Sequence, residues 1–314
     1  MRHIDKEEIA RRLTYERCIP IVRDAMIAFS TGETKQLLRS ILPLSEGRLF
    51  GVMPGALGAH KPFGAKVLSV FKDNAEKGKQ SHQGVVLLFE PDGGEPVCIL
   101  DAGEITAIRT AAASAVATDA LARKDAKRLT ILGTGEQAIT HARAISKVRK
   151  LETLVVWGRS AERAQALAEK LRAELSIETI VAPTTRVAVL DADIVCTVTS
   201  AVEPILEGKW LRPGVHINLV GSSYAVPAEV DNDVVVRSRF FVDSREGVLA
   251  QGAEFLNAKK AGLIGDDHIK GEIGEVLAGK VEGRRSAEDI TAYKSLGHIA
   301  QDLASAWALY AEDI

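Results

Sequence analysis

A glycine-rich turn at residues 133–138, with the sequence GTGEQA, carries the strongest chemical signal in the chain. It follows an apolar run that ends at Leu132 and opens a helical pattern, so we expect a strand, a tight turn and a helix. In such a unit the first glycine permits the turn, the second lets a backbone N–H approach a pyrophosphate, and the helix N-terminus attracts the phosphates. A plain strand-to-helix turn is the alternative. The motif predicts a dinucleotide site formed by Gly133, Thr134, Gly135, Glu136, Gln137 and Ala138.

The next apolar run bears on the choice of cofactor. It ends at Gly158, Arg159 and Ser160, where an NAD-binding chain usually carries a carboxylate for the ribose 2′-hydroxyl. Arg159 and Ser160, with Arg163 one turn later, can instead bind a 2′-phosphate through charge-assisted hydrogen bonds. We therefore expect NADP(H) to be preferred, with NAD(H) possible. Alternatively, the two arginines only cover a solvated helix start.

Three cations stand in segments where a positive charge is costly unless it is paired or functional. Arg39 interrupts an apolar segment expected to be a strand, Lys66 interrupts another, and Arg109 lies on an alanine-rich helix. Together they would form a clamp for a carboxylate, with arginine as a bidentate donor and lysine as a point charge. From spacing alone the simpler interpretation is favoured, in which each cation pairs with an acid or extends to solvent. The acids considered are Asp73, Asp101 and Glu104.

Among the seven histidines, His82 stands out because it precedes the apolar run VVLLF beside a glycine. There it can donate to a bound substrate, although a hydrogen-bonded turn residue is the commoner reason for such a histidine. The other histidines show no metal-ligand pairing. Cys18, Cys98 and Cys196 are far apart and without metal spacing, so we expect buried thiols, no disulfide and no metal site.

Composition narrows the possible partners. The chain has 314 residues, is 46% hydrophobic, and carries 40 Lys+Arg against 42 Asp+Glu, a net charge of −2. This balance gives no electrostatic case for nucleic acid or an anionic membrane. The N-terminus lacks the apolar core of a signal peptide, and no stretch approaches the roughly 18 apolar residues of a membrane span. We expect a cytoplasmic protein.

The hydrophobic pattern divides the chain into two parts. A helix over Thr14–Ser30 is followed by short alternating runs at 37–44, 48–53, 65–71, 85–89 and 97–100, which predict an antiparallel sheet. Beyond a boundary near Ala117–Lys127, apolar runs alternate with helical patterns, at 129–132, 154–157, 179–182, 194–198, 216–220 and 240–243. The predicted fold class is α/β: a Rossmann-type doubly wound parallel sheet domain plus an α+β domain with an antiparallel sheet.

Several segments together resemble the ornithine cyclodeaminase/mu-crystallin family, in the right order over nearly the whole chain. They are Arg39, FGAKVLSVF, SHQGVVLLFE, ITAIRTAAASAVAT, ILGTGEQA, TSAVEPIL, WLRPGVHINLVGSS and YKSLGHIAQDLASAW. The resemblance implies that Arg39, Lys66 and Arg109 hold a substrate α-carboxylate and that His82 lies beside substrate and nicotinamide. It also implies that the nicotinamide half of the cofactor is approached by Val198, Thr199, Val220, Gly221 and Ser295. We assign Thr110 to the cofactor site as well.

The same resemblance implies roles for the two parts. Residues 1–117 would bind substrate and form a homodimer, with the C-terminal helix 296–314 folding back onto them. Residues 118–295 would form the NAD(P)-binding domain.

Departures from the family pattern point to one branch of it. Ornithine cyclodeaminases carry an Asp, thought to engage the substrate's distal amine, where Ser223 stands here, and they use NAD. The segments WGRS and GSSY are instead similar to the mu-crystallin branch, which uses NADPH and reduces cyclic ketimines. We therefore expect an NADPH-dependent reductase of small cyclic ketimines, with Lys66, His82 and Arg109 catalytic, His82 or Lys66 supplying the proton, and Ser223 contacting substrate. The alternatives are an ornithine cyclodeaminase, an L-amino-acid dehydrogenase, and a non-catalytic protein that binds NADP or another small ligand.

Overall fold

The computed structural model describes residues 1–71, 73–74 and 82–313. The chain forms two compact units, one of residues 1–109 with 298–314 and one of residues 110–297. The boundary falls inside the long helix α3 (Ala102–Leu121), as does the expected boundary after residue 117. The roles expected of the two parts remain predictions.

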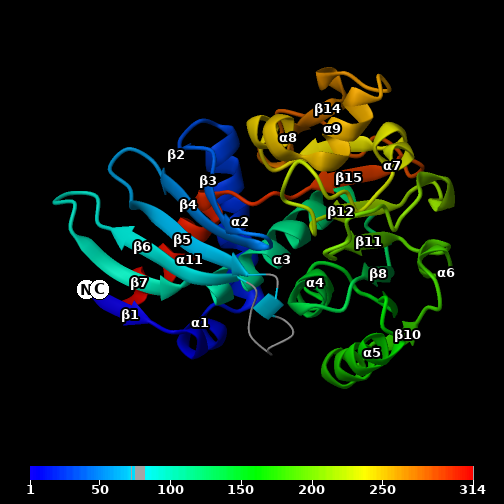
Figure 1. The fold of residues 1–314 in the computed structure, drawn as a ribbon, viewed down its shortest axis with the longest axis horizontal. Coiled ribbons are helices and arrows are strands. Elements are labelled where there is room, and N and C mark those ends of the chain that lie inside the picture. Colours follow the sequence, from blue (N-terminus) through cyan, green and yellow to red (C-terminus); the bar gives the residue numbers. More distant parts are fainter. Residues whose placement is uncertain (72, 75–81, 314) are drawn as a thin grey trace. The chain divides into compact units, whose positions relative to one another are not determined.

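A mostly antiparallel sheet forms the first unit, in the order β1-β7-β6-β5-β4-β2 with β3 paired to β4 (Figure 1). Strands β4 to β7 are a meander, as expected. The added strand β1 runs parallel to β7, and three residues were too few to signal it. The strands are β1 (Arg2–Ile4), β2 (Lys35–Gln36), β3 (Ser40–Ser45), β4 (Arg48–Ala56), β5 (Phe63–Phe71), β6 (His82–Phe89) and β7 (Pro96–Asp101).

The C-terminal helix packs on this sheet and on a helix from the other end of the sequence. Helix α11 (Ile299–Tyr310) lies against β4, β5, β6 and α2. A Cβ at Gly55 of β4 would collide with the Ile299 side chain, so glycine is required for this close approach. The other helices of the unit are α1 (Lys6–Arg12), α2 (Tyr15–Ser30) and the short η4 (Ala311–Asp313).

The expected position of Arg39 inside a strand is wrong. Strand β4 pairs with β2 at Gly55 and Ala56 and with β3 only from Val52 onward, so residues 37–39 lie opposite just two residues of β4. The extra residue interrupts the ladder at this point, and residues 37–39 form no strand. Arg39 therefore lies in a connection between β2 and β3.

A parallel sheet forms the second unit, in the order β10-β9-β8-β11-β12-β15-β13-β14, and confirms the predicted fold class. The strands are β8 (Arg128–Leu132), β9 (Thr153–Trp157), β10 (Glu178–Val181), β11 (Ile194–Thr197), β12 (His216–Leu219), β13 (Arg239–Val242), β14 (Ile269–Glu272) and β15 (Thr291–Lys294). The sequence did not predict β14 or β15. Each has four residues with charged or small side chains among them, although β15 is wholly buried.

Helices and buried side chains cover both faces of this sheet. Val155 belongs to one apolar cluster and its neighbours Leu154 and Val156 belong to the other, so alternate residues of one strand are buried on opposite faces. The helices are α4 (Glu136–Ser146), α5 (Ala161–Leu175), α6 (Thr185–Val189), η2 (Gly208–Trp210), α7 (Asn232–Arg237), α8 (Arg245–Gln251), α9 (Ala253–Lys260), η3 (Asp266–His268) and α10 (Ile273–Leu277).

Three further expectations concerned the cysteines, metal sites and membrane-spanning segments. Cys18, Cys98 and Cys196 are buried free thiols. Within the described ranges, no group of three or more His, Cys, Asp and Glu side chains is arranged to hold a metal ion. No helix of the described chain is both long and apolar enough to cross a membrane.

Candidate functional site

The glycine-rich turn lies at the topological switch point of the parallel sheet. The chain passes from β8 outward to β9 and β10, then returns to β11 on the other side of β8, so the carboxyl ends of β8 and β11 are where sheets of this kind bind their ligands. Gly133 has φ +136° and its N–H donates to the Trp157 carbonyl at 2.9 Å. Apart from its neighbours in sequence, no atom of the described residues lies within 4 Å of where a Cβ at Gly135 would be, so these residues leave space beside the N-terminus of α4. The turn fits the phosphates of a dinucleotide.

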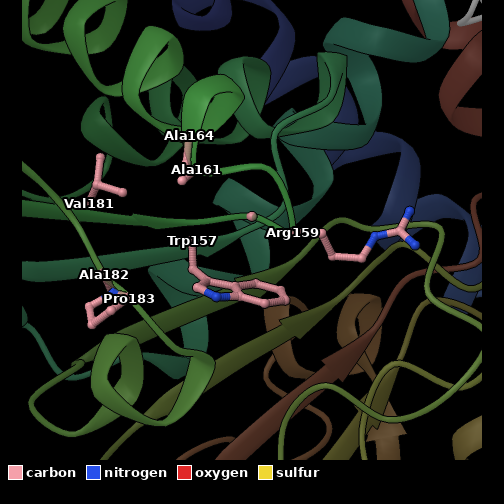
Figure 2. A pocket seen from close by; sticks show the side chains of 8 residues that line it. Trp157, Arg159, Ala161, Ala164, Val181, Ala182 and Pro183 are labelled. Carbon is pink, nitrogen blue, oxygen red and sulfur yellow. The ribbon is translucent and has the colours of Figure 1, made fainter.

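A hollow of about 330 Å³ lies beside this turn, at the ends of β9 and β10 (Figure 2). The Trp157 indole and small apolar side chains line it, and Arg159, at the carboxyl end of β9, is also part of its lining. A Cβ at Gly158 would collide with the Thr134 methyl group, so a side chain at position 158 would require Thr134 to move. The Ser160 hydroxyl accepts from the Arg163 N–H at 3.2 Å and caps α5. Arg159 and Arg163 are both exposed.

A buried carboxylate that the sequence did not reveal joins the loops after β11 and β12. Glu229 accepts hydrogen bonds from the Thr197 hydroxyl at 2.7 Å, the Thr199 N–H at 2.6 Å and hydroxyl at 2.7 Å, and the Gly221 N–H at 2.7 Å. Burial raises its pKa although these hydrogen bonds oppose the shift. Glu229 therefore fixes the loops that carry Thr199 and Gly221.

A second buried charge pair supports the same edge of the parallel sheet. The Lys294 ammonium lies 2.8 Å from a Glu254 carboxylate oxygen and donates to the Ser222 carbonyl at 2.6 Å. Ser223 follows in an irregular loop and is half-buried. The remaining residues of this edge that were expected to approach the nicotinamide are all buried: Val198, Val220 and Ser295.

In the first unit, the structure brings two of the three predicted cations onto one carboxylate. The Lys66 ammonium lies 3.0 Å from both oxygens of Asp302, and the Arg109 Nε lies 3.0 Å from one of them. The Arg109 Nη1 donates to the Gln301 side-chain oxygen at 2.9 Å, and Lys66 also donates to the Thr106 hydroxyl at 3.4 Å. Lys66 comes from β5, Arg109 from α3 and Asp302 from the first turn of α11.

The protonation of this cluster follows from burial and charge. Burial, opposed by Asp302, lowers the pKa of Lys66 to about 8. Burial disfavours the ionised form of Asp302, but the charges and hydrogen bonds of Arg109 and Lys66 prevail and lower its pKa. At neutral pH the cluster therefore holds a protonated lysine and an ionised aspartate.

His82 and Arg39 lie close enough to this cluster to share its electrostatics. The His82 ring keeps contact with solvent, yet the protein packed around it and the charges of Lys66, Arg109 and Arg39 lower its pKa to about 4. Arg39 also contributes to the lowered pKa of Lys66. The four candidates of the first unit thus belong to one electrostatic neighbourhood. Ser223 and Thr110 belong to the second unit, where Thr110 is buried on α3.

For Lys66 and Arg109, the acidic partners expected from the sequence were the wrong residues. Asp73 pairs with Arg48 at 3.0 Å, Asp101 accepts from the Glu104 N–H at 2.7 Å, and Glu104 lies 3.8 Å from Lys6. The actual partner, Asp302, is 236 residues from Lys66 and 193 residues from Arg109 in sequence. Its signal was a charged residue on the apolar face of an amphipathic helix, between Ile299 and Leu303.

Comparison with known proteins identifies a family that the chain matches over nearly its whole length. The model of the ornithine cyclodeaminase/mu-crystallin family matches residues 3–313. The ketimine reductase mu-crystallin of Mus musculus is 35% identical over 296 residues, which cover 93% of this chain and 90% of the mouse protein.

Two solved structures extend the match to the fold. The Thermococcus litoralis Delta(1)-pyrroline-2-carboxylate reductase in complex with NADH and L-proline superposes with a TM-score of 0.96 and 34% identity, covering 99% of this chain and 97% of that one. An archaeal alanine dehydrogenase dimer with bound NAD gives a TM-score of 0.93 and 25% identity, covering 100% and 97%. The chain belongs to the ornithine cyclodeaminase/mu-crystallin family.

Proposed function

We propose that the protein is an NADPH-dependent reductase of the C=N bond in small cyclic α-imino acids, such as pyrroline-2-carboxylate and piperideine-2-carboxylate, and that it forms L-amino acids. The observation that carries this proposal is the buried cluster in which Lys66 and Arg109 share Asp302. With Arg39 nearby, its cations outnumber its carboxylate, so it favours an anionic ligand. The names of the mouse and Thermococcus relatives support the class of reaction.

Arg109 is oriented for the substrate carboxylate. Asp302 occupies its Nε and Gln301 its Nη1, which leaves Nη2 available among the described contacts. Because two of its edges are already fixed, the guanidinium loses little further freedom when it binds an anion. Orienting the carboxylate in this way positions the imine carbon, and such positioning can contribute about 7 kcal/mol or more to catalysis.

Lys66 is the better proton donor of the two candidates. With a pKa of about 8 it is protonated at neutral pH, whereas His82, with a pKa of about 4, is neutral and can only act as a hydrogen-bonding contact. The dinucleotide, when bound, supplies the hydride that adds to the imine carbon. Lys66 would then provide the proton for the nitrogen, and Asp302 would hold the ammonium in place.

Arg159 is proposed to select NADPH. Arg159→Asp should raise the Kd for NADPH by about 10-fold to 100-fold, because a 2′-phosphate loses a charge-assisted hydrogen bond and meets an anion. The Kd for NADH should fall, since a free 2′-hydroxyl gains an acceptor. Fluorescence titration with both cofactors measures the two constants, and Arg11→Asp on the exposed surface of α1 is the matched control. An unchanged ratio of the two constants would remove Arg159 from the cofactor site.

Ser223 is proposed to favour imine reduction over cyclisation of a diamine. A cyclic ketimine has no distal ammonium, so an aspartate at 223 would be a half-buried anion without a cationic partner. We expect Ser223→Asp to lower kcat/KM for the imine by about 10-fold or more, and the unmodified protein to release little ammonia from L-ornithine. An ammonia assay run beside NADPH oxidation decides this. Ornithine turnover faster than imine reduction would restore the cyclodeaminase interpretation.

A homodimer formed through the first unit is the proposed assembly. Leu42 and Leu44 of β3 and Phe50 of β4 are 59%, 52% and 38% exposed, an apolar area that a second copy would cover. The archaeal alanine dehydrogenase was described as a dimer. Sedimentation velocity should give the mass of two chains, and a mass of one chain at micromolar concentration would contradict this assembly.

One panel of substrates tests the proposed reaction. Cyclic imines, α-keto acids with amines, and basic amino acids are each offered with NADP(H) and NAD(H). The proposal predicts the fastest turnover with a cyclic imine and NADPH. Faster amine-dependent reduction of a keto acid would indicate an amino-acid dehydrogenase. A protein that turns over none of them, while NADPH still raises its melting temperature, would be a binding protein.

A further inference from the structure

His298 is a buried histidine whose hydrogen bonding is incomplete. It precedes α11, is 2% exposed, and stacks on Phe29 with ring centroids 4.4 Å apart. Its Nε2 lies 3.4 Å from the Gln301 side-chain nitrogen. Its Nδ1 has no hydrogen-bond partner in the part of the chain that the structure describes. A buried polar atom without a partner is costly, so this one calls for a ligand.

The neighbours of His298 determine which nitrogen carries the proton. Arg109 can only donate, so the oxygen of the Gln301 amide must face the Arg109 Nη1, and the amide nitrogen must face His298. That nitrogen is also a donor, which makes the His298 Nε2 an acceptor. Burial, with the charge of Arg109 next in effect, lowers the pKa of His298 to about 3, so the ring is neutral. Its single proton therefore lies on Nδ1, as an N–H donor that has no acceptor among the described residues.

The charges around His298 indicate the kind of acceptor. Three cations, Arg109, Arg39 and Lys66, and one carboxylate, Asp302, act on its ring. Positive charge is in excess, so the acceptor that completes the site is expected to be an anion. We infer that His298 is a further substrate-binding residue, whose Nδ1–H donates to the α-carboxylate held by Lys66 and Arg109. The inference rests on the proposed function, because it names a contact of the same substrate.

A neutral hydrogen-bond donor such as His298 has an advantage over a further cation at this site. It contributes a directed hydrogen bond without increasing the repulsion among Arg39, Lys66 and Arg109. Gln301 links it to Arg109, since one amide contacts both side chains. Arg109 and His298 are thereby oriented together, and a carboxylate that binds one is guided to the other.

Two substitutions of His298 distinguish the contribution of Nδ1 to binding from that of Nε2. The His298→Gln side chain can place an acceptor near the Nε2 position but has no donor at Nδ1, whereas His298→Asn places an amide N–H near Nδ1. His3→Gln, at an exposed position of β1, controls for the substitution itself. The probe is cyclopentanecarboxylate, an unreactive cyclic acid, compared with cyclopentanecarboxamide by titration calorimetry on the full chain in the presence of NADPH.

We expect the unmodified protein to bind the carboxylate at least about 10-fold more tightly than the amide. His298→Gln should weaken carboxylate binding by about 10-fold or more, and His298→Asn should restore most of it. NADPH affinity should stay the same in all variants, and each variant should still unfold in a cooperative thermal transition, at a temperature lowered by the lost stacking on Phe29. Undiminished binding by His298→Gln, an equal loss in His298→Asn, or no carboxylate binding by the unmodified protein would each overturn the inference.

The outcomes distinguish this inference from the proposed function. One outcome is that the protein binds the carboxylate, responds as expected to the substitutions at His298, and reduces no imine. The proposed reductase function would then be wrong, and His298 would still be an anion-binding residue. Imine reduction unaffected by His298→Gln would keep the reductase and remove His298 from the site.

Discussion

Lys66→Met should lower kcat/KM for a cyclic imine by about 1000-fold or more while the protein stays folded. Methionine keeps the apolar stem of the side chain but removes both the proton donor and a positive charge from the carboxylate site. Asp302 remains paired with Arg109 through the Nε contact at 3.0 Å, so no unpaired buried charge is left to unfold the protein. Steady-state NADPH oxidation gives the rate, and the melting temperature reports the fold.

Lys61→Met is the matched control, because Lys61 forms an exposed ion pair with Glu33 and should tolerate the same change with full activity. If Lys66→Met kept most of the activity of the unmodified protein, Lys66 would be a structural residue and the proposed mechanism would be wrong.

Asp302→Asn should produce the largest loss of stability, about 3 to 5 kcal/mol in the free energy of unfolding. The substitution leaves Lys66 and Arg109 buried without their shared carboxylate, and it places an amide N–H group where an acceptor is needed. Chemical denaturation of the variant and the unmodified protein measures the difference. Because the folded-state pKa of Asp302 is lowered, its contribution is complete above its ordinary pKa of 3.8 and is lost as pH falls through the folded-state value.

The same substitution should shift the pH dependence of catalysis. Asp302 raises the pKa of Lys66, so its removal lets burial lower that pKa below 8. In the unmodified protein kcat/KM should fall as pH rises through about 8, and in Asp302→Asn the fall should begin at lower pH. Because both proteins are measured with the same substrate, protonation of the imine itself affects the two pH profiles equally. Asp92→Asn, in an exposed turn, is the control, and an unchanged profile in Asp302→Asn would separate Asp302 from the protonation of Lys66.

Local patterns were sufficient to predict most of the fold. The meander and the strand-helix alternation were recognisable because each element carries its own periodicity and turn residues. Strand β15 was not recognised although it lies between β12 and β13 in the sheet. Its four residues, TAYK, are too few to show a period and end in a lysine, which is buried here because Glu254 pairs with it.

In the candidate site too, some residues could be predicted from local sequence and others could not. Lys66 and Arg109 could be selected from the sequence because cations in apolar segments are conspicuous. Their partner Asp302 could not be paired with them, since the pairing depends on how α11 packs against the sheet of the first unit. The role of Glu229 could not be predicted from the sequence either, because its hydrogen bonds join strand ends that only the folded sheet brings together.

In the proposed function, a buried cationic cluster recognises the carboxylate of a cyclic imine that the protein reduces. The direct measurement is the rate of NADPH oxidation with piperideine-2-carboxylate and with piperideine, the same ring imine without its carboxylate. We expect rapid reduction of the first and a kcat/KM lower by about 100-fold or more for the second. Equal rates with the two imines, or no NADPH oxidation with either, would contradict it.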